Sequence, residues 1–341
     1  MLKPFIAKVV NLQSLSASEA ESAMEIIMTG QASPAQIGGY LVALRMKGES
    51  VEEIVGSARS MRAHASRVVV HLKANDLLDT AGTGGDQSHS FNISTAAALV
   101  IAGTGRSVAK HGNRAASSSC GSADVLAALG VNIDLTPEQV AMCIEQIGIG
   151  FMFAPKFHPA MKHAIGPRRE LGQRTIFNLL CPLTNPAGAT HQLLGVYSAA
   201  LTETLANVLG FLGSKAALVV HGYGGLDELT TSGMNRISHL KDGKVRTYEY
   251  DPSKLGLRRA GPEDIRGGNP EQNAVILHDI LSGKDTSPRR DVVLLNAAAA
   301  LSAESGDLEA GLGAAETALN SGAALAKLDA LVATSHRVAL A

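Results

Sequence analysis

The stretch 79-DTAGTGGDQSHSFNIST-95 decides the fold class. The residues at 77–80 predict a strand, the glycines that follow predict a tight turn, and 92–102 predicts a helix. Bare glycine backbone lets an anionic group approach N–H donors closely, and a helix N-terminus adds its dipole. This unit therefore predicts an α/β protein that binds a phosphate or pyrophosphate at the carboxyl end of a strand.

The glycine loop does not match the commonest nucleotide motifs. A dinucleotide fingerprint would need glycine at 82, 84 and 87, but the last position is Gln87. A Walker A loop needs Gly-Lys-Ser/Thr after four spacer residues, and the sequence has none. The sequence supports neither a standard NAD site nor a standard ATPase site.

A second strand-loop-helix unit follows in 107-SVAKHGNRAASSSCGSADVL-126. Lys110 stands at the predicted end of the strand, and several serines precede the helix, which again suits phosphate. Taken singly, Lys110 or Arg114 is more often a solvated charge, and His111 a structural histidine. Two such loops at the ends of two strands favour one polyanionic ligand.

A third unit, 216-ALVVHGYGGLDELT-230, places Asp227 and Glu228 after a predicted strand and three glycines. A lone Asp-Glu pair is more often a solvated turn. Beside two phosphate-type loops it has another use, because proteins hold Mg²⁺ with one or two carboxylates, substrate phosphate oxygens and waters. The pair is too small for a structural metal cage and suits a Mg²⁺–pyrophosphate ligand.

Helical and strand patterns divide the chain. Capping boxes at Ser16 and Ser50 and a Ser-Pro start at Ser33 predict helices, and no strand, in the first 65 residues. From residue 68 onward short apolar runs alternate with helical patterns, which predicts βαβ units. We expect an α/β fold with a small all-helical N-terminal domain at 1–66, completed by about 158–187, and a larger domain at 67–341 with a mainly parallel central sheet flanked by helices.

The sequence also predicts details of the larger domain. Asp242-Gly243 predicts a hairpin turn, and the Ala- and Leu-rich sequence from Asp291 onward predicts a pair of closing helices. Besides 77–80, the expected strands cover 107–109, 149–153, 193–197, 216–221, 237–240 and 245–250.

The composition is that of an ordinary globular protein. Of 341 residues, 45% are hydrophobic and 18% charged, and a net charge of -1 gives no basic field for nucleic acid. Three scattered cysteines, Cys120, Cys143 and Cys181, argue against a disulfide framework and for a reducing compartment. The N-terminus lacks the apolar core of a signal peptide, and no window resembles a membrane span. We expect a soluble, cytoplasmic chain with no membrane or nucleic-acid partner.

The ordered motifs resemble one enzyme family over nearly the whole chain. They are GTGGD (82–86), NIST (92–95), KHGNRAASS (110–118), NPA (185–187), HGxGGLDE (221–228), GGNPEQNA (267–274) and RDVVLLNAAAAL (290–301). Together they resemble anthranilate phosphoribosyltransferase. One position departs from the pattern, because Gln87 stands where the family usually has Gly.

The resemblance implies a reaction. Members transfer the 5-phosphoribosyl group of 5-phosphoribosyl 1-diphosphate (PRPP) to the amine of anthranilate, which gives N-(5-phosphoribosyl)anthranilate and diphosphate in tryptophan biosynthesis. The resemblance also implies a requirement for Mg²⁺, an active site in the hinge between the two domains, and a homodimer formed through the helical domain.

The resemblance further implies overlapping sets of site residues. The PRPP set is Gly82, Gly85, Asp86, Ser90, Asn92, Ile93, Ser94, Thr95, Lys110, His111, Gly112, Asn113, Arg114, Ala115, Ala116, Ser117, Ser118, Ser119 and Ser122. The anthranilate set is Gly82, Asn113, Arg168, His111, His158 and Pro182. The metal set is Ser94, Asp227 and Glu228, and catalytic roles fall to His111, Asp227 and Glu228.

These roles are chemically reasonable. The aryl amine is neutral at pH 7 and needs little activation, whereas departure of diphosphate needs stabilised charge. His111 could help to remove the proton lost from nitrogen. Arg168 can bind the anthranilate carboxylate as a planar fork, although without the resemblance it reads equally well as a surface arginine at a helix start.

Two alternatives stay open on the sequence alone. A pyrimidine nucleoside phosphorylase shares the fold, but it would not need the Asp227–Glu228 pair or the intact KHGNRAASS run. A non-catalytic nucleic-acid-binding member of the fold should carry a basic stripe, whereas 30 Lys and Arg face 31 Asp and Glu here.

Overall fold

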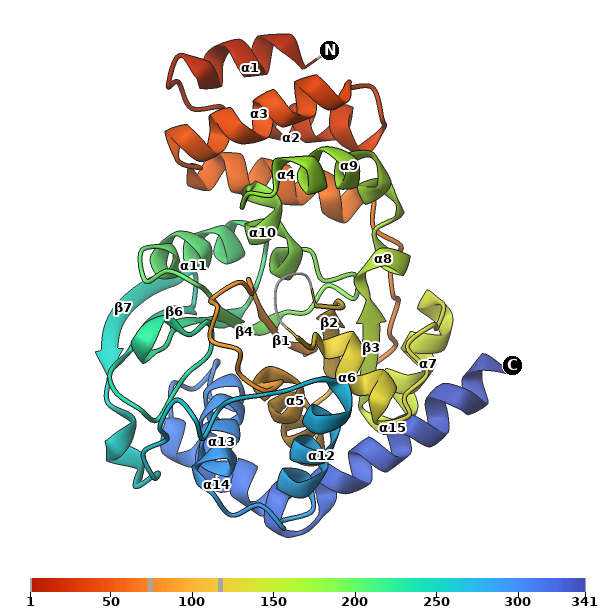
Figure 1. Ribbon diagram of the computed structural model, residues 1–341, viewed down its shortest axis with the longest axis vertical. Helices are drawn as coiled ribbons and strands as arrows, with labels where there is room; N and C mark the ends of the chain where they lie inside the picture. Colours follow the sequence, from red (N-terminus) through yellow and green to blue (C-terminus); the bar gives the residue numbers. More distant parts are fainter. Residues whose placement is uncertain (1, 73–75, 116–118, 341) are drawn as a thin grey trace.

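The computed structural model describes residues 2–72, 76–115 and 119–340. A helical part stands above a part built on a sheet (Figure 1). The serines at 16, 33 and 50 cap their helices as predicted, and no strand occurs in 2–72. The helical part begins with α1 (Lys3–Val10), α2 (Ala17–Met28), α3 (Pro34–Lys47) and α4 (Val51–Ala63).

A later segment of the chain joins these helices. After α8 (Ala154–Phe157), which packs on β3, it contains α9 (Lys162–Leu171) and α10 (Ile176–Leu180), with short 3₁₀ turns at Pro159–Met161 and Cys181–Leu183. α9 packs against α2 and α3, and α10 packs against α3 and α4. Phe177 shares a buried cluster with Met24 and Leu41. The helical prediction for this segment is confirmed, whereas the domain boundaries stay a prediction.

Seven strands of the described residues form one sheet in the order β3-β2-β1-β4-β5-β6-β7. The first five in that order run parallel, and β6 and β7 are antiparallel, so the sheet is mainly parallel as predicted. The strands are β1 (Leu78–Gly82), β2 (Val108–Gly112), β3 (Ile149–Phe153), β4 (His191–Gly195), β5 (Ala216–His221), β6 (Asn235–Lys241) and β7 (Lys244–Tyr250).

Several strands differ from their predicted bounds by one to three residues, and in β2 and β4 the cause is buried polar residues. β2 continues to Gly112, since the backbone of Lys110 and His111 pairs with β3. β4 begins at His191 instead of residue 193, since His191 and Gln192 are buried and pair with β1. Polar residues hide a strand from an apolar pattern. The predicted hairpin at 242–243 is confirmed, with positive φ at both residues.

Helices cover both faces of the sheet (Figure 1). α5, α13, α14 and α15 pack on one another on one side, and α11 packs on β5, β6 and β7 on the other. The sequence after Asp291 forms three helices, not the predicted pair, because turns at Gly306 and Gly322 with positive φ interrupt it. The helices are α5 (Ile93–Gly103), α6 (Ser122–Ala128), α7 (Pro137–Ile147), α11 (Leu201–Phe211), α12 (Pro270–Leu281), α13 (Pro288–Leu301), α14 (Leu308–Asn320) and α15 (Ala323–Ala339).

The strand order creates a switch point between β1 and β4. From β1 the chain moves outward to β2 and β3, and it then returns to β4 on the other side of β1. The loops that follow β1 and β4 therefore diverge, and ligands of open α/β sheets bind in the crevice at such a point. No helix in the described part of the chain is long and apolar enough to cross a membrane.

Candidate active site

A cleft of about 940 Å³ lies at the carboxyl ends of the central strands. Its floor contains the glycine loop after β1, the loop after β2 and the Asp227–Glu228 pair after β5. Its opposite wall comes from the helical part and carries three cations, Arg45, Arg168 and Arg174. The structure thus brings the three predicted loops to one cavity between the two parts of the chain.

The acidic pair is hydrogen-bonded to two parts of the first unit, the glycine loop and the start of α5. The Gly84 N–H donates to Asp227 Oδ2 at 2.6 Å, and the Asp227 N–H donates to Asp86 Oδ2 at 3.3 Å. At the start of α5, the Ser94 N–H donates to Glu228 Oε1 at 2.8 Å. These contacts hold three carboxylates close to the glycine loop and to a helix N-terminus.

The pKa values of both acids in the pair are raised. Burial, followed by repulsion from Asp86, raises the pKa of Asp227 to about 7. Burial, followed by repulsion from Asp227, raises the pKa of Glu228 well above its usual value. A cation would relieve both effects because it favours the ionised carboxylates. Within the described residues, no group of three or more His, Cys, Asp or Glu side chains is placed to hold a metal ion.

Two glycines make room for Asp227. A Cβ at Gly195 would lie 1.5 Å from the Asp227 carbonyl oxygen, and one at Gly82 would lie 2.6 Å from Asp227 Oδ2. Gly82 and Gly195 are also paired across β1 and β4. Sequence reasoning missed Gly195, because a single glycine at a strand end gives no signal until its partner strand is known.

Lys110 is a buried cation under the floor of the cleft. Its Nζ donates to the Thr80 carbonyl at 2.7 Å. The side chain is buried, so Lys110 is not a solvated surface charge, which is the more common state of a single lysine. Burial lowers the pKa of Lys110 to about 8, against the attraction of Asp79 and Glu228. The amine therefore presents a positive charge beside the carboxylates.

Behind the cleft, Asp79 is hydrogen-bonded to both the KHGNRAASS motif and the NPA motif. It is fully buried and accepts hydrogen bonds from the His111 N–H at 3.2 Å and from Asn185 Nδ2 at 2.7 Å. Asn185 Nδ2 also donates to the Ala109 carbonyl at 2.8 Å. The NPA motif of the resemblance thus supports the strand that carries Lys110 and His111.

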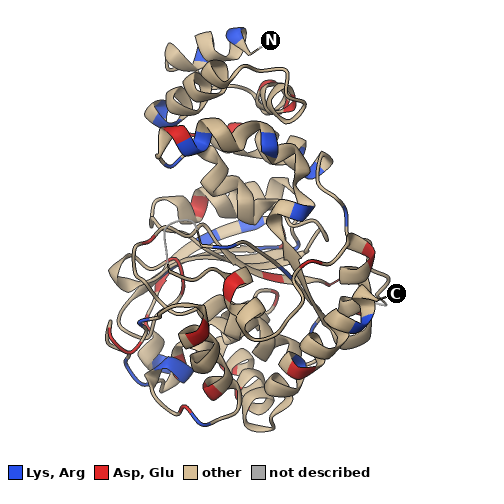
Figure 2. Cartoon of the chain, turned by 45° about the vertical axis from the view of Figure 1, so that its right-hand side comes forward, with Lys and Arg blue, Asp and Glu red and all other residues tan. Residues whose placement is uncertain are grey.

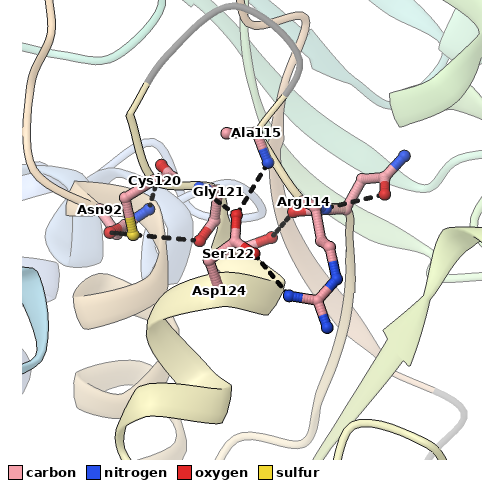
Figure 3. A network of polar contacts seen from close by, with 8 residues as sticks. Asn92, Arg114, Ala115, Cys120, Gly121, Ser122 and Asp124 are labelled. Atoms are coloured by element: carbon pink, nitrogen blue, oxygen red, sulfur yellow. Dashed lines mark hydrogen bonds and ion pairs between the residues drawn. The ribbon is translucent and has the colours of Figure 1, made fainter. Parts of the chain in front are cut away.

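Asp124 fixes both ends of the loop after β2 (Figure 3). Its carboxylate pairs with Arg114 Nη1 at 2.7 Å and accepts from the N–H groups of Ala115 at 2.9 Å and Gly121 at 3.0 Å. Arg114 therefore lies at the cleft with its charge partly balanced. The predicted site residues Ala116, Ser117 and Ser118 lie outside the described residues.

Asn92 joins this loop to the start of α5. Its Nδ2 donates to the Cys120 carbonyl at 3.2 Å, and its Oδ1 accepts from Cys120 Sγ at 3.3 Å (Figure 3). The same Oδ1 also accepts from Asn273 Nδ2 at 2.9 Å. Asn273 belongs to the GGNPEQNA motif, so this motif supports the site from behind. Sequence reasoning had given Asn273 no role.

The other side of the cleft carries Arg168 and a pair of histidines. The Arg168 guanidinium lies 5.0 Å from the centre of the Phe177 ring. The His111 and His158 ring centres are 5.0 Å apart, and neither Nε2 has a hydrogen-bond partner among the described residues. Burial lowers the pKa of His111 to about 3, with His158 adding to it, and burial lowers that of His158 to about 4. Both rings are therefore neutral at pH 7.

Most predicted site residues within the described ranges line the cleft, and three do not. Ile93 is buried in the main core, and its N–H donates to the Phe91 carbonyl. Ser119 is exposed away from the cleft lining, and His158 lies behind His111. The lining residues are Gly82, Gly85, Asp86, Ser90, Asn92, Ser94, Thr95, Lys110, His111, Gly112, Asn113, Arg114, Ala115, Ser122, Arg168, Pro182, Asp227 and Glu228.

The helical wall contains cleft residues that sequence reasoning missed. Val42, Arg45 and Met46 of α3 and Arg174 after α9 all line the cavity. Met46 is 80% exposed, which is unusual for a long apolar side chain. In the sequence, the signal for this wall was the apolar pair Val42 and Met46, four residues apart on a predicted helix.

The family models match both parts of the chain. The helical bundle domain of a glycosyl transferase family matches residues 3–65, and the a/b domain of that family matches residues 74–325. Anthranilate phosphoribosyltransferase of Moorella thermoacetica is 56% identical to the chain over 335 residues, which cover 98% of each protein. The chain belongs to the anthranilate phosphoribosyltransferase family. It is therefore a pentosyltransferase by family, and the phosphorylase and nucleic-acid-binding alternatives no longer apply.

Solved structures of the family superpose closely. The Thermus thermophilus member has a TM-score of 0.92 and 45% identity, with 97% of this chain and 99% of that one covered. The Saccharomyces cerevisiae member in complex with PRPP and Mg has a TM-score of 0.90 and 29% identity, with 98% of each chain covered. The same yeast protein is also known with 4-fluoroanthranilate, at a TM-score of 0.88, 28% identity and the same coverage.

Surface charge agrees with this assignment. Figure 2 shows acidic and basic residues interspersed over both parts of the chain. Since 30 Lys and Arg face 31 Asp and Glu, no net basic field is present to attract a polyanionic polymer. The concentrated charge is instead in the cleft, where carboxylates face arginines.

Proposed function

We propose that the chain transfers the 5-phosphoribosyl group of PRPP to the amine of anthranilate and releases diphosphate, as a step in tryptophan biosynthesis. The observation that carries this proposal is one cleft with Asp86, Asp227 and Glu228 on its floor, two phosphate-type loops beside them and Arg168 on its opposite wall. The yeast family member binds PRPP with Mg in one structure and 4-fluoroanthranilate in another, which supports the same pair of substrates here.

The donor diphosphate belongs at the glycine loop and the start of α5. Gly85 offers bare backbone there, and the helix N-terminus favours an anion. The Thr95 hydroxyl is buried and has no partner among the described residues, so it is free to bind a ligand oxygen. Lys110 adds a positive charge beneath the loop. The other predicted PRPP residues that line the cleft keep their proposed roles.

Mg²⁺ fits the acidic floor of the cleft. We assign it to Asp227, Glu228 and Ser94, with Asp86 close by, because the raised pKa values of the two acids show carboxylates that a cation would stabilise. When bound, Mg²⁺ supplies charge neutralisation for the diphosphate leaving group. The protein's own task is to orient the diphosphate with N–H donors and to exclude water from the ribose carbon.

The acceptor belongs against the helical wall. Arg168 binds the anthranilate carboxylate, while Asn113 and Pro182 border the ring. The amine nitrogen then forms a bond to C1 of the ribose as the bond from C1 to the diphosphate oxygen breaks, and nitrogen loses one proton. His111, which is neutral and has an unpartnered Nε2, can accept that proton. His158 lies behind His111 and supports its position.

Two architectural expectations belong to the same proposal. We place the domain boundary near residues 66 and 67, with about 158–187 completing the helical domain. We also propose a homodimer through the helical domain, whose outer helix α1 ends at the exposed Val10 and is followed by the exposed Leu12. Light scattering of the purified chain should give twice the mass of one chain, and a double Val10→Glu, Leu12→Glu variant should shift it toward a monomer.

Anthranilate fluorescence tests the reaction. Purified chain, PRPP and MgCl₂ should together remove the fluorescence of anthranilate, and omission of any one of the three should prevent the loss. Folded protein that binds PRPP and leaves anthranilate unchanged would retain the phosphate site but overturn anthranilate as the acceptor.

A further inference from the structure

Arg174 reaches across the cleft to the glycine loop. It lies between α9 and α10, in the helical part, and its Nη2 donates to the carbonyl of Gly85. The centre of its guanidinium is 4.0 Å from the centre of the Tyr197 ring, which follows β4. One side chain of the helical part thus contacts two loops at the switch point of the sheet.

The two loops that Arg174 contacts are hydrogen-bonded to each other. Gly85 has φ 74°, and a Cβ there would lie 3.0 Å from Arg174 Nη2, so the glycine leaves room for the guanidinium. The Tyr197 N–H donates to Thr83 Oγ1 at 3.1 Å, and the Thr83 N–H donates to the Gly195 carbonyl at 2.9 Å. The Tyr197 loop and the glycine loop are therefore bound to each other, and Arg174 is held by both.

The backbone on either side of Arg174 connects it to residues proposed to bind anthranilate. The Gly172 N–H donates to the Arg168 carbonyl at 3.3 Å and closes α9 two residues before Arg174. The Thr175 N–H donates to Asn178 Oδ1 at 3.0 Å and opens α10 one residue after it. Short, capped backbone therefore connects Arg174 to Arg168 on one side and to the Pro182 turn on the other.

We propose that Arg174 is a positioning residue that couples the two substrate sites, so that a ligand on the glycine loop favours anthranilate binding against the helical wall. This inference rests on the proposed function. Such coupling is reciprocal, because each ligand changes the affinity of the other by the same factor. The contact requires arginine, since a planar guanidinium can stack on a ring and donate to a carbonyl at once, whereas a lysine ammonium is a point charge.

The test measures anthranilate binding to the full chain with and without a nonreactive stand-in for the donor. Anthranilate is titrated by its fluorescence anisotropy in MgCl₂ alone and in MgCl₂ with inorganic diphosphate, and the ratio of the two Kd values is the coupling factor. For the unmodified chain we expect a factor of about 5 or more, as is typical of coupled sites. Arg174→Gln should bring it close to one.

Matched variants separate coupling from stability. Arg169→Gln removes an exposed arginine of α9 that has no hydrogen bond or ion pair among the described residues, and it should leave the factor unchanged. Arg174→Lys keeps the charge and a donor but not the stacking plane, so it should fold and give a reduced factor even if Arg174→Gln does not. A merely structural role would lower Tm in the Arg174 variants and keep the factor at its original value, which would overturn the inference.

The activity of the unmodified chain distinguishes failure of the proposed function from failure of the proposed role of Arg174. If that chain does not consume anthranilate with PRPP and MgCl₂, the proposed function has failed. If it is active and its coupling factor is one, or if Arg174→Lys retains the full factor, only the role of Arg174 is overturned.

Discussion

Asp227 Oδ2 accepts a hydrogen bond from the backbone N–H of Gly84 at 2.6 Å, although the two residues are 143 positions apart in the sequence. This contact joins the loop after β5 to the loop after β1, two strands that are separated in the sheet by β4. The acid is seated there because Gly82 and Gly195 have no side chains. The phosphate loop and the acidic pair therefore form one unit.

The acidic pair should make the effect of Mg²⁺ depend on pH. The folded-state pKa values of Asp227 and Glu228 are raised, so the folded chain binds more protons than the unfolded chain, and stability without metal should fall as pH rises through about 7. Mg²⁺ competes with those protons. The rise in Tm on adding MgCl₂ should therefore be larger at pH 8 than at pH 5.5, as measured by differential scanning fluorimetry.

A double variant provides the control for this effect. Asp227→Asn with Glu228→Gln should lose most activity and most of the pH-dependent Mg²⁺ shift, whereas Glu52→Gln, an exposed carboxylate of α4, should retain both. An unchanged Mg²⁺ titration in the double variant would remove the metal role from these residues.

Arg168 should govern the acceptor and not the donor. Arg168→Ala should raise the anthranilate KM far more than the PRPP KM, because the fork that binds the carboxylate is lost. A charge-assisted hydrogen bond contributes about 1.5–3 kcal/mol, which corresponds to roughly 10- to 100-fold in KM. The neighbouring exposed Arg169→Ala should leave both constants near their original values. Equal effects of Arg168→Ala on both substrates would contradict the assignment.

His111 should contribute as an aid to proton removal. Its pKa of about 3 means that the ring is neutral throughout the working range, so the pH–rate profile should show no inflection near 6.5 from this residue. His111→Ala should slow turnover by a modest factor, within about 10²-fold. A loss beyond about 10⁴-fold would exceed the usual contribution of a general base and would show that the role is different.

Gly195 should tolerate no side chain. A Cβ there would lie 1.5 Å from the Asp227 carbonyl oxygen, so Gly195→Ala should displace the acidic pair, abolish activity and cost about 1–3 kcal/mol or more of stability. Gly313→Ala, at an open position on α14, should instead stabilise the chain by about 0.5–1 kcal/mol. Urea unfolding and initial rates measure the two effects, and an active Gly195→Ala variant would contradict this packing.

Gln87 should be replaceable by the glycine that the family usually has. Its φ is 60°, so the side chain occupies a left-handed backbone conformation that glycine adopts without strain. Gln87→Gly should change stability by less than about 1 kcal/mol, because relief of strain is offset by a more flexible unfolded chain. The β-branched Gln87→Val should be clearly worse in both stability and PRPP KM, and a Gln87→Val variant equal to the parent would contradict the loop geometry.

Local patterns predicted the parts of the fold that local physics decides. The serine caps of α2–α4, the hairpin at 242–243 and the parallel sheet all follow from side chains that act within a few residues. The bounds of β2 and β4 did not follow, because their buried polar residues are stabilised by partners far away in the sequence. Lys110 and His191 have no apolar signature that would mark them as strand residues.

The site residues also fall into those that local motifs predict and those that depend on contacts with distant segments. The three floor loops could be predicted because glycines, hydroxyls and acids beside strand ends suit a phosphate ligand. Gly195, Asn273 and Arg174 could not be predicted, because each acts only through a contact with a distant segment. The placement of Ile93 in the core also depends on packing that no motif reveals.

The most direct test of the central claim is the stoichiometry of the reaction, followed by ³¹P NMR with anthranilate measured in the same sample. With MgCl₂ present, the account predicts one diphosphate released and one PRPP consumed for each anthranilate lost, and no diphosphate release when anthranilate is omitted. Diphosphate release without anthranilate, or loss of anthranilate without diphosphate, would contradict a cleft that holds PRPP on its acidic floor and anthranilate against Arg168.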